Sequence, residues 1–448
     1  MSESIKSVGG RNLTLRDELQ QFVWLHKPYF YIYEWIPFDP NIFEEIAEEL
    51  EAKNREKGIL LTDEVDSFPE KPVFVKPPVA STVSVVDYEF NRVLKLEAFI
   101  GYPEVAEQVE RIGIEIRDYG SVIYGLQIQH VDEEPNVSLD KLARIIFDVI
   151  EDTSRLMSSI LSLYQRRVLN IIYPGYKEEG FERRKYTVVI SEKALISGRE
   201  IDKEEILNTL LKEPFINEVK QIVGPITSYA RENGLCLING SYGMLILGKT
   251  EDSKLLSLYA SVKALEMFLE DLLVYLWMVW EKLGDARKVV LRGDVKELKK
   301  VRVQLVSILS DFTLLKSIMG TITYSLDRIE AESKTIESIE LNSLGFSKIF
   351  RAIRNRCKTI GSLFESIERE IDGLLMVINT HIEEALDRLN TLTFWLSIIF
   401  GSFGLGQLAV AIAPWFMEPV ESTIVSSIAT VLPIALGLLL QVSGGGRK

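Results

Sequence analysis

Cysteine and histidine are scarce in this chain, and both shortages narrow its function. Its 448 residues include 2 cysteines, Cys236 and Cys357, and 3 histidines. Two thiols far apart exclude a fold built on disulfide bonds, and their spacing resembles no zinc site. With so little histidine, an active site centred on an imidazole is not expected. We therefore expect free thiols in a reducing compartment.

The chain also lacks the motifs and the charge of several large protein classes. No Walker loop, His-Glu-x-x-His, Cys-x-x-Cys or Gly-x-Ser-x-Gly pattern occurs, so we expect no enzyme and no cofactor. The 65 acidic side chains outnumber the 51 basic ones, which gives a net charge of -14. An acidic chain lacks the dense basic surface that binds phosphate backbones, and this excludes a typical nucleic-acid-binding protein.

Charge almost disappears after Thr391. The charged side chains beyond it are Glu418, Glu421, Arg447 and Lys448, and they cancel. Two uncharged runs, 392–417 and 422–442, each reach the roughly 18–20 apolar residues that cross a membrane as a helix. The four residues 418–421 leave room only for a tight turn. The pattern predicts a transmembrane helical hairpin, so membrane lipid is an expected partner.

The charges around the hairpin predict its orientation. The turn carries two acids and no base, whereas Arg388 precedes the first run and two bases follow the second. Residues 1–16 have no apolar core and predict no signal peptide. Since basic residues favour the cytosolic side, we expect a two-span protein of the cell membrane with both termini in the cytosol. Glu418 and Glu421 would then form an acidic ring on the outside.

Small and polar residues run through the middle of the first span. The candidates for lining a pore are Ser397, Gly401, Ser402, Gly404 and Gln407. The alternative is close helix packing, because Ser397 with Gly401 and Ser402 with Gly406 are small residues four apart. The sequence leaves both interpretations open.

A long apolar seam precedes the first span. It steps by four and three residues through Ile353, Cys357, Ile360, Phe364, Ile367, Ile371, Leu374, Ile378 and His381. Such a repeat predicts a coiled-coil or bundle helix, here called the stalk, over 346–391. Its partners could lie in the same chain or in another copy. His381 is either a packing residue or, in a symmetric oligomer, part of a ring that responds to ions or pH.

Two further helices are expected before the stalk. The pattern predicts one from 252 to 283, ended by Gly284-Asp285, and another from about 295 to 332. A basic patch of Arg287, Lys288, Arg292, Lys296, Lys299, Lys300 and Arg302 lies between them. It is interpreted as a solvated helix start, with contact to anionic lipid or a polyanion as the alternative.

The first half of the chain reads as mixed α/β. Strands are predicted at 73–75, 81–88, 93–99, 112–116, 122–129 and 186–190, and a hairpin at 235–247. Helices are predicted at 43–57, 139–172 and 203–211. Acidic clusters occur at 44–51 and 132–134. They are interpreted as solvated faces, with a weak site for a divalent cation as the alternative.

These patterns divide the chain into an α+β cytosolic domain, long stalk helices and a C-terminal two-helix membrane hairpin. The predicted segments are a flexible N-terminus (1–20), the α/β domain (21–250, with a sub-boundary near 173–184) and a helical region (251–345). They continue with the stalk (346–391), the first span (392–417), the outer turn (418–421), the second span (422–442) and a cytosolic tail (443–448).

This order of segments resembles the CorA-type divalent-cation channel superfamily. The closest local similarity is the junction 381–393, where a polar stalk helix turns apolar. The Gly-Met-Asn signature of that superfamily is absent from the first span. The resemblance implies a homopentamer whose first spans line an axial pore for Mg²⁺ or another divalent cation. It also implies that acidic residues in the position of Glu418 and Glu421 attract cations.

Two functions remain open at this point. One is a divergent CorA-like cation channel or transporter. The other is a membrane-anchored interaction or sensory protein without transport, in which the stalk forms a dimer. The sequence identifies neither the ion nor a metal ligand.

Overall fold

The computed structural model describes residues 22–36, 43–45, 47–48, 84–87, 92–98, 112–127, 135–160, 171–172, 184–196, 198–202, 204–232, 235–248, 253–335, 346–416 and 418–444. The chain divides into two compact units. The first comprises Met1–Val279 and Ser310–Glu365, and the second comprises Trp280–Leu309 and Ser366–Lys448. Three long helices contribute residues to both units.

A nine-stranded sheet forms the centre of the first unit. In sheet order its strands are β11 (Ile226–Glu232), β12 (Leu235–Gly240), β13 (Gly243–Leu247), β8 (Tyr186–Ser191), β2 (Tyr29–Trp35), β6 (Ser121–Gln127), β5 (Ile112–Arg117), β4 (Arg92–Ala98) and β3 (Ser84–Asp87). Neighbours are antiparallel except β13 and β8. Because alternate residues of a strand face opposite sides, each strand directs one row of side chains towards each of the two faces of the sheet.

A smaller sheet and three helices cover one face of the large sheet. The smaller sheet has the order β10 (Arg199–Glu200), β9 (Lys193–Ile196), β1 (Val23–His26) and β7 (Asn136–Ser138), all antiparallel. The helices are α3 (Leu139–Ile160), α6 (Ile206–Leu210) and α7 (Phe215–Val223). Phe30 and Ile32 of β2 belong to the core beneath them and are fully buried. Burying each such side chain contributes about 1.5–3 kcal/mol.

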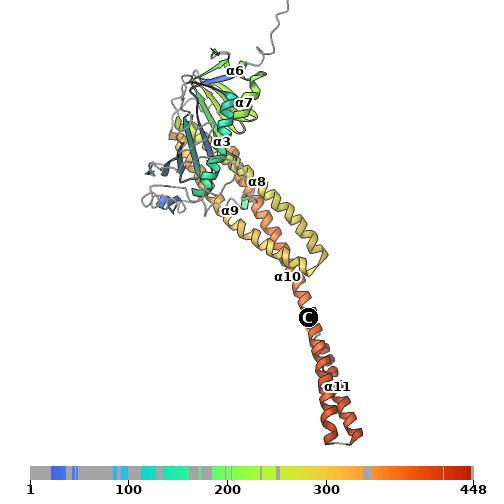
Figure 1. The fold of residues 1–448 in the computed structure, drawn as a ribbon. Coiled ribbons are helices and arrows are strands. Elements are labelled where there is room, and N and C mark those ends of the chain that lie inside the picture. Colours follow the sequence, from blue (N-terminus) through green and yellow to red (C-terminus); the bar gives the residue numbers. More distant parts are fainter. Residues whose placement is uncertain are drawn as a thin grey trace, which may run out of the picture. The chain divides into compact units, whose positions relative to one another are not determined.

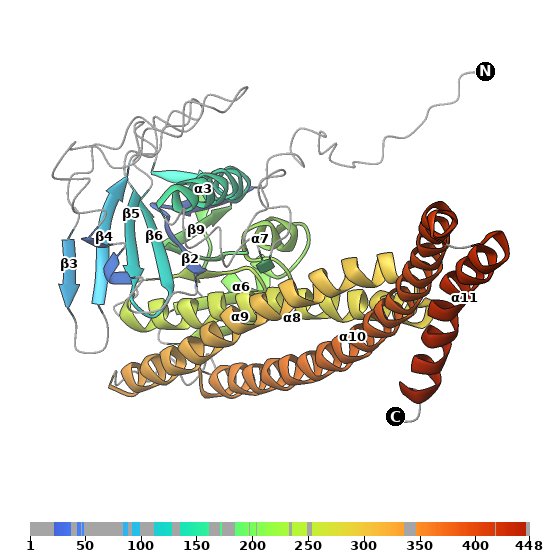
Figure 2. The same ribbon diagram turned by 90° about the horizontal axis from the view of Figure 1, so that it is seen from below.

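The first half of α8 (Ser253–Arg292) lies on the opposite face of the large sheet (Figure 2). Its contacts there are partly polar. The Arg117 guanidinium donates to Ser257 Oγ at 2.9 Å, and Ser121 Oγ donates to Ser261 Oγ at 2.7 Å. Buried polar groups need partners, so these hydrogen bonds specify where α8 sits on the sheet.

Two further long helices pack beside α8. They are α9 (Val295–Thr335) and α10 (Phe346–Ile412). Phe312 of α9 and Phe364 of α10 meet edge to face, with ring centroids 4.9 Å apart. Arg354 of α10 also binds Asp327 of α9 at 2.7 Å. The three helices therefore form a bundle, and α10 contains the stalk predicted at 346–391.

The predicted end of the first of these helices is wrong. Gly284 and Asp285 lie inside α8, which continues to Arg292. Leu283, Ala286 and Val290 are all buried, so the apolar stripe passes straight through the glycine. A glycine inside a helix costs only about 1 kcal/mol, which this burial offsets. The helix ends instead at Gly293, whose φ of 70° suits glycine.

The connection between the two hairpin helices begins earlier in the chain, and is longer, than the predicted turn 418–421. Helix α10 ends at Ile412, a 3-10 turn covers Ala413–Trp415, and α11 (Pro419–Gly444) begins three residues earlier than the predicted 422. Proline at the first position of a helix is favourable because its missing N–H has no partner there anyway. Glu421 thus lies in the first turn of α11 rather than in a loop.

Three helices of the described residues are long and apolar enough to cross a membrane: α9, α10 and α11. Helix α9 buries Phe312, Leu315 and Ile322 among its neighbours, so we assign it to the bundle. The apolar ends of α10 and α11 remain largely exposed, as expected of helices whose environment is lipid.

The predicted fold class is confirmed: an α/β domain precedes long helices, and the last ones are apolar enough to span a membrane. Predicted strands coincide with β3, β4, β5, β6 and β8, and the predicted hairpin is β12–β13. The strands β1, β2, β7, β9, β10 and β11 and the helix α7 were not predicted. The prediction for 73–75 and most of 43–57 lies outside the described residues.

Candidate functional site

The stalk buries its apolar seam within the same chain. Seam residues from Ile353 to Ile378 are buried or nearly so, except that Cys357 is half-buried. Their neighbours include α8 and α9, since Arg356 contacts Glu270 of α8 and Phe364 contacts Phe312 of α9. For this part of the stalk, a partner in another chain is not required. Burial also raises the pKa of the Cys357 thiol to about 11.

Coverage of the seam ends before the membrane span. His381 and Ala385 are half-buried, and then Leu389 and Leu392 are 61% and 59% exposed. Leu386 is also 50% exposed. Leu386 and Leu389 lie before the predicted first span, which begins at Leu392, and water makes the exposure of these two side chains unfavourable. The stalk between Ala385 and Leu392 is therefore the part of the seam that the chain leaves uncovered.

One face of the first span packs tightly on α11. Ser402 is fully buried, and a Cβ added at Gly406 would lie 2.2 Å from Thr430 Oγ1. A Cβ at Gly437 of α11 would likewise lie 2.5 Å from Ile398. Of the two small-residue pairs in the packing interpretation, Ser402 with Gly406 lies where the two backbones approach closely, whereas Ser397 and Gly401 are exposed. Ser402 belongs to this packing face.

The opposite face of the first span remains uncovered. Ser397, Gly401, Gly404 and Gln407 are exposed, and nothing lies within 4 Å of a Cβ added at either glycine. Bulky apolar side chains such as Phe400 and Leu408 are exposed among these small residues, and the outer face of α11 likewise presents Ile428 and Leu439. We call Ser397, Gly401, Gly404 and Gln407 the small-residue face. Four of the five pore-lining candidates thus lie on this exposed face, and the fifth, Ser402, lies on the face that packs against α11.

The two acids of the hairpin lie at the connection between its helices. Glu418 directly precedes α11 and Glu421 is in its first turn, and both are exposed. The Glu418 carbonyl accepts the backbone N–H of Ser422 at 3.0 Å and so closes the first turn. Acids at a helix N-terminus are also favoured by the helix dipole. The structure therefore gives these residues a local role that is compatible with an acidic ring.

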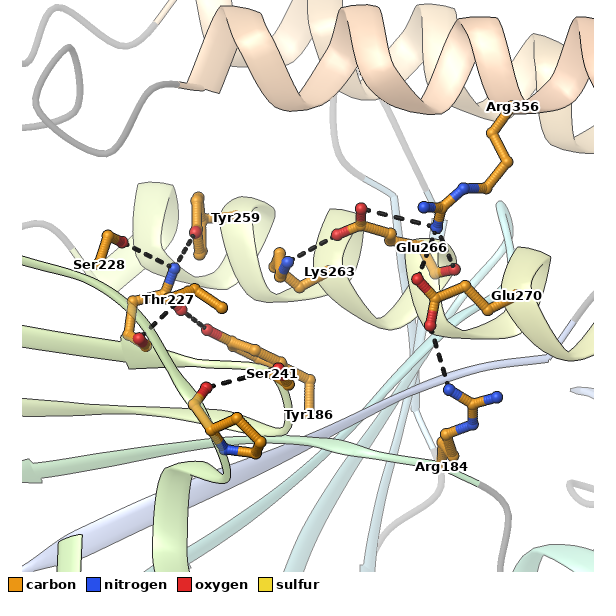
Figure 3. Close-up of polar contacts among 12 residues, drawn as sticks. Arg184, Tyr186, Thr227, Ser228, Ser241, Tyr259, Lys263, Glu266, Glu270 and Arg356 are labelled. Atoms are coloured by element: carbon orange, nitrogen blue, oxygen red, sulfur yellow. Dashed lines mark hydrogen bonds and ion pairs between the residues drawn. The ribbon is translucent and has the colours of Figure 1, made fainter. Parts of the chain in front are cut away.

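A network of charges links the sheet, α8 and the stalk, and the sequence analysis did not find it. Arg184, next to β8, donates to Glu270 Oε2 at 3.1 Å, while Arg356 of α10 donates to Glu270 Oε1 at 3.0 Å. Figure 3 shows the two arginines on different sides of this carboxylate. Arg184 also pairs with Asp271, and Lys263 pairs with Glu266 at 2.6 Å. A displacement of the start of β8 can thus reach α10 through one side chain, Glu270.

Hydrogen bonds continue this connection towards β12. Asn239 Nδ2 donates to Tyr259 of α8 at 2.9 Å, and the Tyr186 hydroxyl donates to Asn239 Oδ1 at 2.5 Å (Figure 3). Burial raises the pKa of both tyrosines, so they stay protonated and act as donors and acceptors only. This arrangement holds α8 on the sheet and offers no nucleophile or base.

Among the described residues, no group of three or more His, Cys, Asp or Glu side chains could hold a metal ion. Of the predicted acidic cluster at 44–51, Glu44 instead pairs with Arg92 at 2.6 Å, and the described Glu45 and Glu48 are exposed. The cluster at 132–134 lies outside the described residues. The described part of the α/β domain thus gives no support to a preformed cation site.

Comparison with known proteins finds a family match for the first half of the chain. The model of the MJ1566 N-terminal domain matches residues 18–250, just over half of the chain. A protein of Methanocaldococcus jannaschii named "Uncharacterized protein MJ1566" is 24% identical over 307 residues. The alignment covers 67% of this chain and 64% of that protein, which is therefore a distant homologue.

Proposed function

This chain belongs to the MJ1566 N-terminal domain family, and from its C-terminal helices we propose that it is an oligomeric membrane protein of CorA-like architecture that conducts a cation. In this proposal several copies surround an axis, and the first spans line it with the small-residue face. The protein then lies in the cell membrane with both termini in the cytosol. No catalytic activity is assigned to it.

The observation that carries the proposal is the contrast between the two faces of the first span. Ser402 and Gly406 lie buried on the face that packs against α11, whereas Ser397, Gly401, Gly404 and Gln407 are exposed. A span surrounded only by lipid gains nothing from glycine and glutamine on its outer face, because an exposed polar group in hydrocarbon is costly. Small and polar side chains towards a water-filled axis remove that cost.

The stalk supports the same assembly. The uncovered seam from Ala385 to Leu392 and the small-residue face lie on one helix, so in the proposed assembly neighbouring copies cover the seam and enclose the pore. Exposed Glu418 and Glu421 at the outer end would raise the local concentration of cations. Mg²⁺ is the first ion to test, because the resemblance to the CorA superfamily suggests it.

Flux into liposomes tests conduction. The full chain is reconstituted, and Mg²⁺ entry is followed with an enclosed indicator. We expect Gly404→Leu to reduce entry by about tenfold or more, because it narrows the axis. The matched control is Ala435→Leu, the same kind of enlargement on the exposed face of α11, which should leave entry unchanged. Equal effects of the two variants, or no entry above protein-free liposomes, would contradict the proposal.

A second candidate function is an anchor without transport. The tight contact of Gly406 with Thr430 favours it, because this contact makes a stable hairpin without any other copy. Native mass spectrometry separates the two functions. A five-fold or similarly closed ring supports the channel, whereas a monomer or a dimer without cation entry supports the anchor.

A further inference from the structure

The turn between α8 and α9 carries a dense cluster of positive charge in an acidic protein. Residues 287–302, here called the basic tip, contain two acids, Asp294 and Glu297, and seven bases. The bases are Arg287, Lys288, Arg292, Lys296, Lys299, Lys300 and Arg302. All seven are exposed, and all belong to the second compact unit together with the end of α10 and with α11. The function proposed above makes no use of this cluster.

The lysines of the tip form one face of α9. Lys296, Lys299 and Lys300 recur at helical spacing and are exposed, whereas the neighbouring Leu298 and Val301 are buried. Within the part of the chain that the structure describes, none of the three lysine side chains makes an ion pair. Their charge is thus directed outwards and not neutralised locally.

Helix stability does not account for these lysines. Bases at the end of α8, such as Arg292, are favoured by the negative end of the helix dipole. The lysines of α9 stand in its first two turns, where the dipole is positive and opposes them. Helix-dipole stabilisation therefore accounts for the bases at the end of α8 but not for the lysines at the start of α9. An anionic ligand outside the chain would compensate for this repulsion.

The tip also presents an exposed apolar side chain. Leu291 is 87% exposed beside Arg292, at the last turn of α8. An apolar residue next to several bases is the pattern of segments that rest on a lipid surface, where the bases meet the headgroups and the apolar group enters between them. The combination favours a membrane over a soluble polyanion.

The tip extends along α10 in the direction of the membrane span (Figure 1). Glu270 of α8 meets Arg356, and further along both helices Arg287 Nε meets Glu370 Oε1 at 2.5 Å, so α8 and α10 run in the same direction. Glu370 precedes Leu392 by 22 residues, which is about 33 Å at 1.5 Å per residue. The tip continues about 9 Å beyond Arg287 and ends about 24 Å from the span.

The headgroup layer and the length of a lysine side chain together cover about half of this distance. The headgroup layer adds about 6 Å outside the hydrocarbon, and an extended lysine side chain reaches about 6 Å. The remaining 12 Å or so is close to the Debye length of about 8–10 Å. A tilt of α10 towards the side of the tip, within the roughly 0–40° range of membrane helices, shortens it further. The tip can thus reach the surface when α10 tilts towards the side of the tip.

We infer that the basic tip binds anionic lipid headgroups of the membrane leaflet nearest to it. Lys296, Lys299 and Lys300 supply the charge, and Leu291 supplies an apolar contact. The inference requires the two-span hairpin but not conduction, so it holds for a channel and for an anchor alike.

Hydrogen exchange of the full chain in nanodiscs tests this inference. Exchange of residues 286–303 is compared in phosphatidylcholine and in phosphatidylcholine mixed with phosphatidylglycerol. We expect roughly tenfold slower exchange with phosphatidylglycerol at low salt, and loss of this difference at high salt. The triple variant Lys296→Gln/Lys299→Gln/Lys300→Gln should show no difference between the two lipids.

The matched control is Lys348→Gln/Arg351→Gln/Lys358→Gln, which removes three exposed bases from the start of α10 and should keep the lipid effect. Equal exchange in both lipids would overturn the inference, and so would slow exchange in both, which indicates a protein contact. Retention of both triple variants in membranes after carbonate washing confirms that the hairpin is inserted in each sample.

Discussion

At the scale of single residues, two glycines of the first span have opposite surroundings although they are two positions apart. A Cβ at Gly406 would collide with Thr430, whereas a Cβ at Gly404 would meet nothing within 4 Å. From the sequence, Gly404 was a candidate for lining a pore and Gly406 belonged to a candidate packing pair with Ser402, and the choice between pore and packing stayed open. Only the position of α11 distinguishes them.

We predict that Gly406→Leu destabilises the hairpin by about 1–3 kcal/mol, since the added side chain forces α10 and α11 apart. Gly404→Leu is the matched control and should leave hairpin stability unchanged. The measurement is unfolding in rising concentrations of SDS, followed by tryptophan fluorescence. Equal stability of the two variants would show that the helices are not packed through Gly406.

The half-buried Cys357 gives a second prediction at this scale. With its pKa raised to about 11 by burial, the thiol is almost fully protonated near neutral pH. Because only the thiolate reacts, alkylation by iodoacetamide at pH 8 should be about two hundredfold slower than for an ordinary thiol of pKa 8.5. The rate should rise about tenfold per pH unit up to pH 10. A rate that levels off near pH 9 would contradict the buried environment.

At the scale of elements, the bundle of α8, α9 and α10 is stabilised mainly by its apolar seam. Phe364 is 1% exposed and contacts the ring of Phe312, which is fully buried. We predict that Phe364→Ala lowers the stability of the bundle by about 3–5 kcal/mol. Thermal unfolding in detergent, followed by circular dichroism, measures the effect. Met376→Ala on the same helix is the control, because that side chain is 74% exposed, and a comparable loss there would contradict the assignment of the seam.

The elements also show what sequence reasoning could and could not reach. The long stalk helix and the two long apolar helices could be predicted because the 4–3 repeat of the one and the uncharged runs of the others are local and long. The ends of the two apolar helices were not predicted. Strand β2 was missed because Tyr29–Trp35 is buried on both faces and shows no alternation. The link from Arg184 through Glu270 to Arg356 joins three distant segments, and no local pattern signals such a contact. The sequence listed the small and polar residues of the first span but could not separate Ser402, which packs on α11, from the four exposed residues, because the position of α11 is not a local property of the sequence.

At the scale of the whole molecule, the hairpin predicts the side of the membrane on which each segment lies. We expect a membrane-impermeant maleimide to label Glu421→Cys in intact cells, because Glu421 is exposed and the proposed orientation places the start of α11 outside. Leu291→Cys, in the basic tip, should be labelled only after the cells are permeabilised. The parent chain, with its slowly reacting Cys357 and buried Cys236, is the control. Labelling of Leu291→Cys in intact cells would reverse the proposed orientation.

The 67 residues of α10 form one helix from Phe346 to Ile412, and this continuity fixes an angular phase along its whole length. Each residue turns the helix by about 100°, so the seam and the small-residue face keep a constant angle to one another. Inserting one alanine after Leu389 would rotate the span by about 100° against the bundle, whereas inserting seven would restore the angle to within about 20°. If α10 transmits orientation, the first insertion abolishes function and the second, although longer, largely preserves it.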